Sequence, residues 1–317
     1  MSIPKRVLGV YSSASPHWVG DGFPVRNLIP SNDFGENISP FLMLDYAGPK
    51  EFPPTEKPRG VDEHPHRGFE TVTIVYQGNV AHRDSAGNAG TIGPGDVQWM
   101  TAASGVVHEE KHEPEFARRG GVMEMIQLWV NLPRAQKFAA PRYQDLRASE
   151  VALVSSADGG ALVRVIAGEV AGHAGPGSTY TPMTLVHATL SPGARLTLPW
   201  RADYNALVYG LAGFGTVGAE KRPIQTGQLA VFGEGNTITI DAEPIQESRS
   251  PGLDVLILGG RPIREPVAWM GPFVMNTRDE LLQAYADFQA GRLGSVPAVH
   301  NTPTHVIESR QEPPAGS

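Results

Sequence analysis

Short apolar runs alternate with turn-forming residues along most of this 317-residue chain. The runs are rich in valine, isoleucine, leucine and aromatic residues, and glycine, proline, asparagine or aspartate separates each run from the next, as is typical of β-sandwiches and β-barrels. We therefore predict strands over residues 71–76, 95–100, 122–130, 161–166, 185–190, 206–211, 229–232 and 255–258. The predicted fold class is all-β.

One segment near the C-terminus has a helical pattern instead. Thr277 and Glu280 have the spacing of a capping box, and Gly291 can end a helix in the left-handed conformation. The apolar positions between them recur at helical spacing: Leu281, Leu282, Tyr285 and Phe288. These signals predict a helix over 278–291, and we expect these four side chains to dock it across the β domains.

The polar segment 141–160 has no clear periodicity and is the expected domain boundary. We predict an N-terminal β domain over 1–145, a C-terminal β domain over 146–296 and a flexible tail over 297–317. Segments that begin at His64 and Pro199 each precede an apolar strand, and each reaches a glycine 14 residues later, at Gly78 and Gly213. The sequence therefore contains two copies of one β module. His64 and His66 then correspond to Pro199 and Arg201, so only the first copy keeps metal-binding residue types.

Composition narrows the function classes. The net charge of -7 argues against direct nucleic-acid binding, and no apolar run is long enough to span a membrane. No secretory signal is evident, so we expect a cytoplasmic protein. The chain has no cysteine, which excludes disulfides and thiolate metal sites. Any metal must therefore be held by nitrogen and oxygen ligands.

Two pairs of residues have the spacing of metal ligands on a strand. Residues i and i+2 of a strand point to the same face, so His64 and His66 form one pair, and His108 and Glu110 form the other. Three imidazoles and one carboxylate suit divalent Fe, Mn, Ni, Cu or Co and leave coordination positions open for substrate or dioxygen. Among the other polar side chains, Glu70 is a competing ligand and His82 and His112 are lesser candidates, whereas we expect Glu109 to be a solvent-exposed carboxylate on the opposite face.

Longer motifs surround these residues. The runs His-Pro-His-Arg-Gly-Phe-Glu-Thr at 64–71, Pro-Gly-Asp-Val-Gln-Trp-Met-Thr-Ala at 94–102 and Gln-Leu-Trp-Val-Asn-Leu at 127–132 resemble the pirin family of the cupin superfamily. The segments 232–235 and 265–277 resemble the C-terminal cupin of that family. The resemblance covers residues 6 to about 294.

This resemblance implies a bicupin, with two β-barrels face to face, Fe²⁺ in the N-terminal barrel and a degenerate C-terminal barrel. By motif position, the family's ligands fall on His64, His66, His108 and Glu110, the set that strand parity also selects. The general cupin pattern would instead favour Glu70. We follow the pirin pattern, with Mn, Ni, Co or Cu as alternative metals.

The resemblance also implies a function. Enzymatic pirins are similar to flavonol dioxygenases, so we expect an oxidoreductase that cleaves flavonols such as quercetin with O₂ (a quercetin 2,3-dioxygenase), with Glu110 as the catalytic proton acceptor. Five apolar residues could line a flavonol pocket, although each is equally expected in the core: Phe69, Trp99, Met100, Met123 and Met125. The alternatives are a non-enzymatic iron-binding regulatory protein that acts through protein partners, and an enzyme for another oxygenated metabolite.

Overall fold

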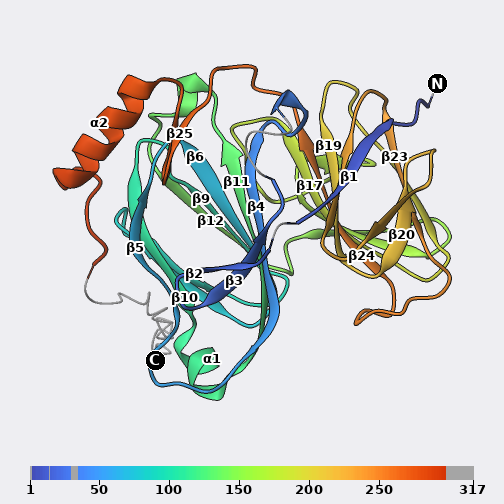
Figure 1. The fold of residues 1–317 in the computed structure, drawn as a ribbon, viewed down its shortest axis with the longest axis horizontal. Helices are drawn as coiled ribbons and strands as arrows, with labels where there is room; N and C mark the ends of the chain where they lie inside the picture. Colours follow the sequence, from blue (N-terminus) through green and yellow to red (C-terminus); the bar gives the residue numbers. More distant parts are fainter. Residues whose placement is uncertain (1, 14, 30–34, 298–317) are drawn as a thin grey trace, which may run out of the picture.

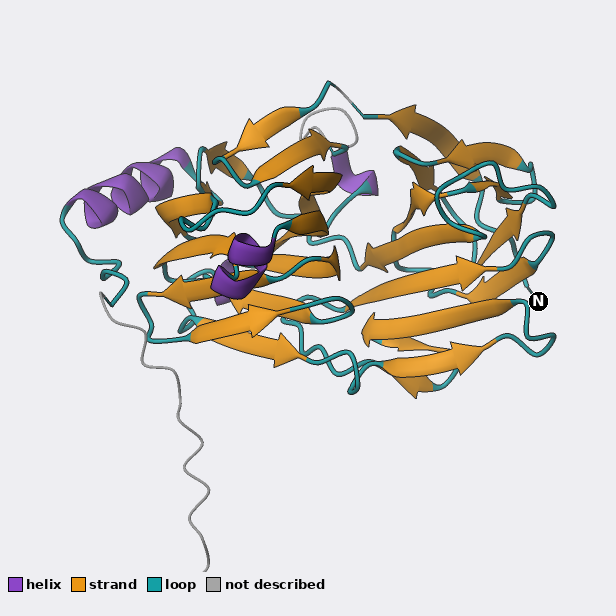
Figure 2. Cartoon of the chain, turned by 90° about the horizontal axis from the view of Figure 1, so that it is seen from below, coloured by secondary structure: helices purple, strands orange, loops and turns teal. Residues whose placement is uncertain are grey.

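Two β domains lie side by side along the long axis of the molecule (Figures 1 and 2). This computed structural model describes residues 2–13, 15–29 and 35–297. Each domain places a seven-stranded sheet opposite a four-stranded sheet, and neighbouring strands within these sheets are antiparallel. The predicted all-β bicupin fold is confirmed. Apart from Pro297, the predicted tail lies outside the described residues.

The first domain contains the N-terminal metal-ligand motifs. Its seven-stranded sheet has the order β12 (Arg142–Leu146), β9 (Val97–Thr101), β6 (Phe69–Gln77), β11 (Gly121–Asn131), β4 (Phe41–Phe52), β3 (Phe23–Asn27) and β2 (His17–Val19). The four-stranded sheet has the order β5 (Gly60–His66), β10 (Val106–His112), β7 (Val80–Asp84) and β8 (Ala89–Ile92). Three short helical turns lie in its connections: η1 (Gly35–Asn37), α1 (Pro114–Arg119) and η2 (Arg134–Gln136).

The second domain repeats this arrangement strand for strand. Its seven-stranded sheet has the order β1 (Val7–Ser12), β22 (Gln228–Phe232), β19 (Ala206–Ala212), β24 (Leu253–Gly260), β17 (Met183–Leu190), β14 (Ala161–Ala167) and β13 (Ala152–Ser155). The four-stranded sheet has the order β18 (Arg195–Pro199), β23 (Thr237–Ala242), β20 (Phe214–Val217) and β21 (Arg222–Gln225). Two small hairpins complete the strands: β15 (Glu169–Val170) with β16 (His173–Ala174), and β25 (Ala268–Met270) with β26 (Phe273–Met275).

The two ends of the chain cross between the domains. Strand β1, blue in Figure 1, pairs with β22 and takes the place in the second sheet that β12 has in the first. The C-terminal hairpin β25–β26 and helix α2 (Arg278–Gln289) lie instead against the first domain. The chain passes from one large sheet to the other between Leu146 and Ala152. Each end of the chain therefore lies with the opposite domain. The predicted boundary after residue 145 stays a prediction.

The eight predicted strands all occur, as β6, β9, β11, β14, β17, β19, β22 and β24, although β9 begins at Val97, two residues after the predicted start. Strands β6, β9 and β19 are almost entirely buried on both faces. The reason is that the two seven-stranded sheets pack against each other, and their shared core includes Tyr46 and Trp99 from one domain and Tyr209 and Leu256 from the other. A strand that is covered on both faces has a continuous run of apolar residues, and this is the pattern that the sequence has at these strands.

Helix α2 begins at the predicted residue and ends at Gln289, two residues before the predicted end, and it does not have the predicted docking. Thr277 and Glu280 form the capping box, and Gly291 has a φ of 71° just past the last turn. The expectation that α2 docks across both domains is wrong, because the hairpin β25–β26 holds the helix on the outside of the first domain. Leu281 is buried there, whereas Leu282 and Phe288 are 52% and 37% exposed. Among the described residues, no helix is long and apolar enough to cross a membrane.

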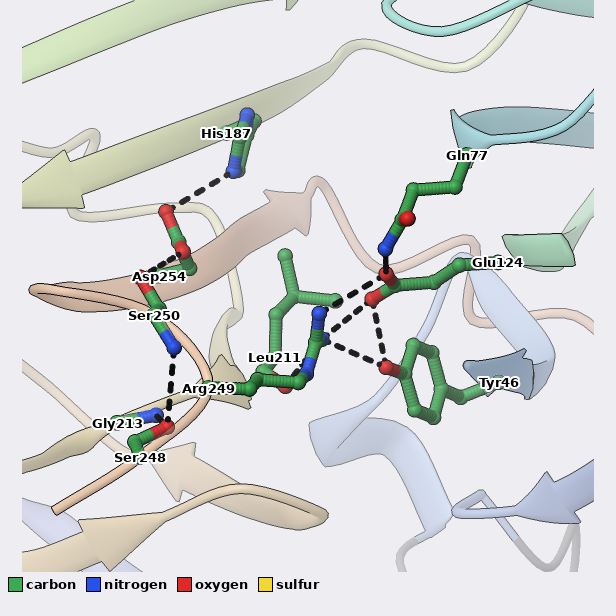
Figure 3. Close-up of polar contacts among 10 residues, drawn as sticks. All are labelled: Tyr46, Gln77, Glu124, His187, Leu211, Gly213, Ser248, Arg249, Ser250 and Asp254. Carbon is green, nitrogen blue, oxygen red and sulfur yellow. Dashed lines mark hydrogen bonds and ion pairs between the residues drawn. The ribbon is translucent and has the colours of Figure 1, made fainter. Parts of the chain in front are cut away.

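Polar residues also join the two domains (Figure 3). Glu124 on β11 forms an ion pair with Arg249, which precedes β24 in the second domain. Tyr46 donates a hydrogen bond to the same carboxylate over 2.7 Å, and Gln77 donates another over 2.8 Å. Burial is the main reason that the pKa of Tyr46 is raised well above its ordinary value. The interface therefore combines an apolar core with a buried carboxylate whose partners come from both domains.

Candidate metal centre

Strands β5 and β10 bring the predicted histidines together. They pair antiparallel with His64 directly opposite His108, and His66 lies two residues along β5 on the same face. The ring centroids of His64 and His108 are 4.3 Å apart, and those of His66 and His108 are 4.9 Å apart. Ligand nitrogens of the three histidines lie within 4.8 Å of one another. The arrangement can therefore hold one metal ion.

Glu110 belongs to a second, overlapping group. It lies two residues beyond His108 and opposite His82 on β7, and its carboxylate forms a candidate ligand group with these two histidines. Two neighbours hold the carboxylate in place: the Thr73 hydroxyl lies 3.0 Å from Oε1, and the Gln127 amide donates to Oε2 over 3.2 Å. His108 is common to both groups, so the four predicted ligands fall into two overlapping groups that share this imidazole.

Backbone carbonyls orient two of the imidazoles. Nδ1 of His64 lies 2.7 Å from the carbonyl oxygen of Asp62, and Nδ1 of His66 lies 3.3 Å from that of Pro272. A carbonyl can only accept, so each Nδ1 carries the proton and each Nε2 keeps its lone pair. Metal-binding histidines in proteins are commonly fixed in this way.

A chain of side chains orients the third imidazole. Nδ1 of His108 lies 3.3 Å from Nδ1 of His82, whose Nε2 lies 3.4 Å from Asp84. If His82 donates to the Asp84 carboxylate, its Nδ1 accepts the proton of His108 Nδ1–H, which leaves Nε2 of His108 with a lone pair. That Nε2 is buried and has no hydrogen-bond partner among the described residues. A metal ion in the site would satisfy it, so the residues fit a metal centre.

The electrostatics favour the metal-binding form of the ligands. Burial, with a smaller contribution from neighbouring His64, lowers the pKa of His66 and of His108 well below its ordinary value. Both imidazoles are therefore neutral at pH 7, and a neutral imidazole is the form that binds metal. Nitrogen and carboxylate donors of this kind suit first-row transition metals better than Ca²⁺ or Mg²⁺.

Glu70 and His112 lie outside the candidate ligand groups found among the described residues. Glu70 is fully buried and accepts a hydrogen bond from the Thr101 hydroxyl over 2.6 Å, and burial raises its pKa to about 7. His112 donates through Nε2 to the carbonyl of Gly22 over 3.1 Å and packs edge-on against Phe52. Of the three other candidates for ligands, only His82 is brought to the site.

The expectation that Glu109 is exposed to solvent is wrong. Its side chain points away from the candidate ligands, as strand parity predicts, but the residue is only 8% exposed. It lies opposite Arg83 on β7 and forms ion pairs with Arg83 and Lys111. The neighbouring strand and β10 itself therefore supply partners that bury this carboxylate.

Comparison with known proteins agrees with this architecture. The sequence model of the family named Pirin matches residues 22–130, and that of the Pirin C-terminal cupin domain matches residues 185–294. The chain is also 48% identical over 288 residues to a Pseudomonas aeruginosa protein named "Putative quercetin 2,3-dioxygenase PA2418", with 91% of this chain and 98% of that protein covered. The chain belongs to the pirin family.

A further relative and a solved structure cover most of the chain. Human pirin is 36% identical over 279 residues, which are 87% of this chain and 89% of human pirin. The crystal structure of a quercetin 2,3-dioxygenase from Acinetobacter baumannii superposes with a TM-score of 0.87 at 44% identity, covering 92% of this chain and 99% of that one. The pirin fold therefore extends over both domains.

A cavity of about 300 Å³ opens beside the candidate ligands of this pirin. Apolar side chains form most of its wall, and the lining residues are His17, Val19, Phe23, Val25, Met43, Asp45, Val61, His64, His66, Glu110, Met125, Gln127 and Trp129. Of the five pocket candidates from the sequence, only Met125 is among them. Phe69, Trp99, Met100 and Met123 lie in hydrophobic clusters. Sequence reasoning missed the contribution of β2, β3 and β4, although parity along 122–130 places Met125, Gln127 and Trp129 on one face.

The second pirin domain has different residues at the equivalent place. Pro199 ends β18 opposite Thr237, as His64 lies opposite His108 in the first domain. Arg201 is exposed and pairs with Asp203 over 3.1 Å. Within the described part of the chain, both candidate metal-binding groups belong to the first domain.

Proposed function

We propose that this pirin is a metal-dependent dioxygenase that cleaves flavonols such as quercetin with O₂. The observation that carries the proposal is a cluster of three histidines, overlapped by a second group that contains Glu110, beside an apolar cavity. The naming of relatives at 48% and 44% identity as quercetin 2,3-dioxygenases supports it. We propose Fe²⁺ as the metal, held by His64, His66, His108 and Glu110, with Mn, Ni, Co and Cu as alternatives that the same ligands suit.

When bound, such an ion supplies a Lewis acid and open coordination positions for substrate and dioxygen. The chain's own residues supply proton transfer and orientation. Glu110 is 5% exposed, and Thr73 and Gln127 hold its carboxylate in place. It accepts the proton of the flavonol 3-hydroxyl, which leaves the substrate as the electron-rich anion. The reaction then adds both atoms of O₂ to the central ring, which opens with loss of carbon monoxide.

The shape of the cavity favours an enzyme over a regulatory protein that acts only through partners. A small-molecule site needs a volume of roughly 300–1,000 Å³ and a mainly apolar lining with a few polar groups. The cavity beside Glu110 has about 300 Å³ and this kind of lining, including Met125 and Trp129. A planar aromatic substrate fits between such walls with its oxygen atoms directed at the candidate ligands.

The test is dioxygen consumption by iron-loaded protein with and without quercetin. We expect His66→Ala to lose bound iron and quercetin-dependent oxygen uptake together, because this imidazole belongs to the ligand group. His173→Ala removes an exposed histidine of the second domain and should leave both unchanged. Oxygen uptake by a variant shown to contain no metal, or no uptake by fully loaded wild type, would refute the proposal.

A further inference from the structure

A row of polar side chains crosses the inner face of the first domain's large sheet. Asn27 on β3 lies opposite Asp45 on β4, Asp45 lies opposite Gln127 on β11, and Gln127 lies opposite Thr73 on β6. Residues that face each other on neighbouring strands point to the same side of a sheet. The row therefore runs from the edge of the barrel to the groups that hold Glu110.

Asp45 is the member of this row that the proposed chemistry does not use. It is 5% exposed and lines the cavity, whereas Leu44 and Tyr46 on either side point into the core between the domains. The Asn27 amide donates to Oδ1 of Asp45 over 2.8 Å, and no described residue donates to Oδ2. Burial raises the pKa of this carboxyl group. A ligand that fills the cavity excludes water from this oxygen, which is costly unless the ligand supplies a donor in its place.

The position of Asp45 indicates which part of a ligand would meet it. Gln127 lies between Asp45 and Glu110, since it pairs with the former along the sheet and donates to the latter. Neighbouring strands are about 4.8 Å apart, so the carboxyl group of Asp45 lies about one strand spacing beyond Gln127. A ligand with one oxygen beside Glu110 would reach Asp45 only with a second, separate polar group. The apolar walls formed by Val25 and Met43 favour an aromatic frame between the two.

We propose that Asp45 accepts a hydrogen bond from a second phenolic hydroxyl of the substrate and thereby selects polyhydroxylated flavonols over flavonols that carry only the 3-hydroxyl. This inference rests on the proposed function, because it assumes a flavonol with its 3-hydroxyl beside Glu110. A buried acceptor left without a donor penalises the analogue that lacks the hydroxyl, and this penalty is how hydrogen-bonding sites discriminate.

The test measures binding, not turnover. The full-length chain is loaded with Zn²⁺, which occupies histidine and carboxylate ligands without redox chemistry, and is titrated with quercetin and with 3-hydroxyflavone. We expect wild type to bind quercetin at least about 10-fold more tightly, the size of one hydrogen bond to a charged group. Asp45→Leu should lose this preference and bind 3-hydroxyflavone at least as well as wild type. The matched control is Glu51→Gln, a change at an exposed carboxylate on the same strand, which should behave as wild type.

The outcomes separate the two proposals. Equal affinity of wild type for both flavonols, or an unchanged preference in Asp45→Leu, overturns the role of Asp45 while flavonol binding itself stands. Binding of neither flavonol by zinc-loaded wild type overturns the flavonol substrate and, with it, the role of Asp45. Because 3-hydroxyflavone reports on the folded cavity in each variant, loss of quercetin binding through misfolding would appear as loss of both ligands.

Discussion

At the scale of single residues, the orientation of His108 decides whether the candidate metal centre is preorganised. Its Nε2 is buried and has no partner in the described part of the chain, and its Nδ1 faces His82, which in turn faces Asp84. The hydrogen-bonded series from His108 through His82 to Asp84 keeps the proton of His108 on Nδ1, so Nε2 of His108 can bind metal. His82 is thus both near enough to be a candidate ligand and placed to orient one.

We predict that His82→Phe weakens metal binding about 10- to 100-fold, because it removes the acceptor for His108 Nδ1–H while filling the same space. His82→Gln keeps an oxygen acceptor and should lose less. The measurement is competition of each variant with a chelator of known affinity, with metal content checked separately. Wild-type affinity in His82→Phe would show that the orientation of His108 does not depend on this neighbour.

The buried carboxyl group of Glu70 gives a prediction for pH. Burial raises its pKa to about 7 in the folded protein, from an ordinary value of 4.5. Between these values the folded state binds more protons than the unfolded state, so this group lowers stability as pH rises from about 5 to 7. In Glu70→Gln this loss is absent, and the free energy of unfolding relative to wild type should rise by up to about 3 kcal/mol from pH 5 to pH 8.

Urea denaturation of metal-free protein at both pH values measures this difference. Glu51→Gln, which alters an exposed carboxylate, should show no such change with pH. A constant difference between Glu70→Gln and wild type would mean that Glu70 ionises normally in the folded protein.

The residue scale also shows what the sequence could and could not predict about the site. Parity within one strand predicts that His64 joins His66 and that His108 joins Glu110, because the i, i+2 relation is local. It cannot predict the position of Asp45 or the pairing of Glu109 with Arg83, since these depend on which distant strand lies alongside. The pairing of β11 with β4 and of β10 with β7 brings these residues together, and no short segment of the sequence specifies which strands pair.

At the scale of elements, α2 illustrates the same division between local and distant information. The capping box of Thr277 and Glu280 is local, and the helix begins where it indicates. Its docking surface is distant: Leu281 packs with Phe273 and Met275 on the outer side of the first domain. Asp287 of the helix also pairs with Arg67 over 2.8 Å, next to the candidate ligand His66. The helix therefore supports the end of β5 from outside.

Two neighbouring leucines of α2 provide a matched test of this docking. We predict that Leu281→Ala lowers the free energy of unfolding by about 2–3 kcal/mol, as for other buried leucines truncated to alanine. Leu282→Ala makes the same chemical change at a side chain that is 52% exposed and should cost less than about 0.5 kcal/mol. Urea denaturation compares the two variants. Equal effects would contradict the observed orientation of the helix.

At the scale of the whole molecule, the second domain covers the back of the sheet whose inner face carries Asp45, Gln127 and Thr73. Its own barrel is filled with apolar side chains, among them Leu198, Trp200 and Tyr204. The repeat in the sequence predicts this duplication and the loss of ligands from the second copy. The pairing of β1 with the second sheet was not predicted, because the local sequence of an edge strand does not specify which sheet the strand joins.

The buried ion pair of Glu124 and Arg249 tests how firmly the two domains are joined. Glu124 is 3% exposed, so removing its partner leaves an uncompensated buried charge. A fully buried pair broken in this way costs about 3–5 kcal/mol, and since Arg249 is itself partly exposed we expect Arg249→Met to lower the free energy of unfolding by about 2 kcal/mol.

Arg195→Ala breaks the exposed pair with Asp241 and should cost less than about 1 kcal/mol. Adding Glu124→Gln to Arg249→Met should recover part of the loss, since the buried charge is then gone. Denaturant unfolding of wild type, the two single variants and the double variant measures these differences. If the double variant is no more stable than Arg249→Met, then lost packing, not an unpaired carboxylate, accounts for the effect.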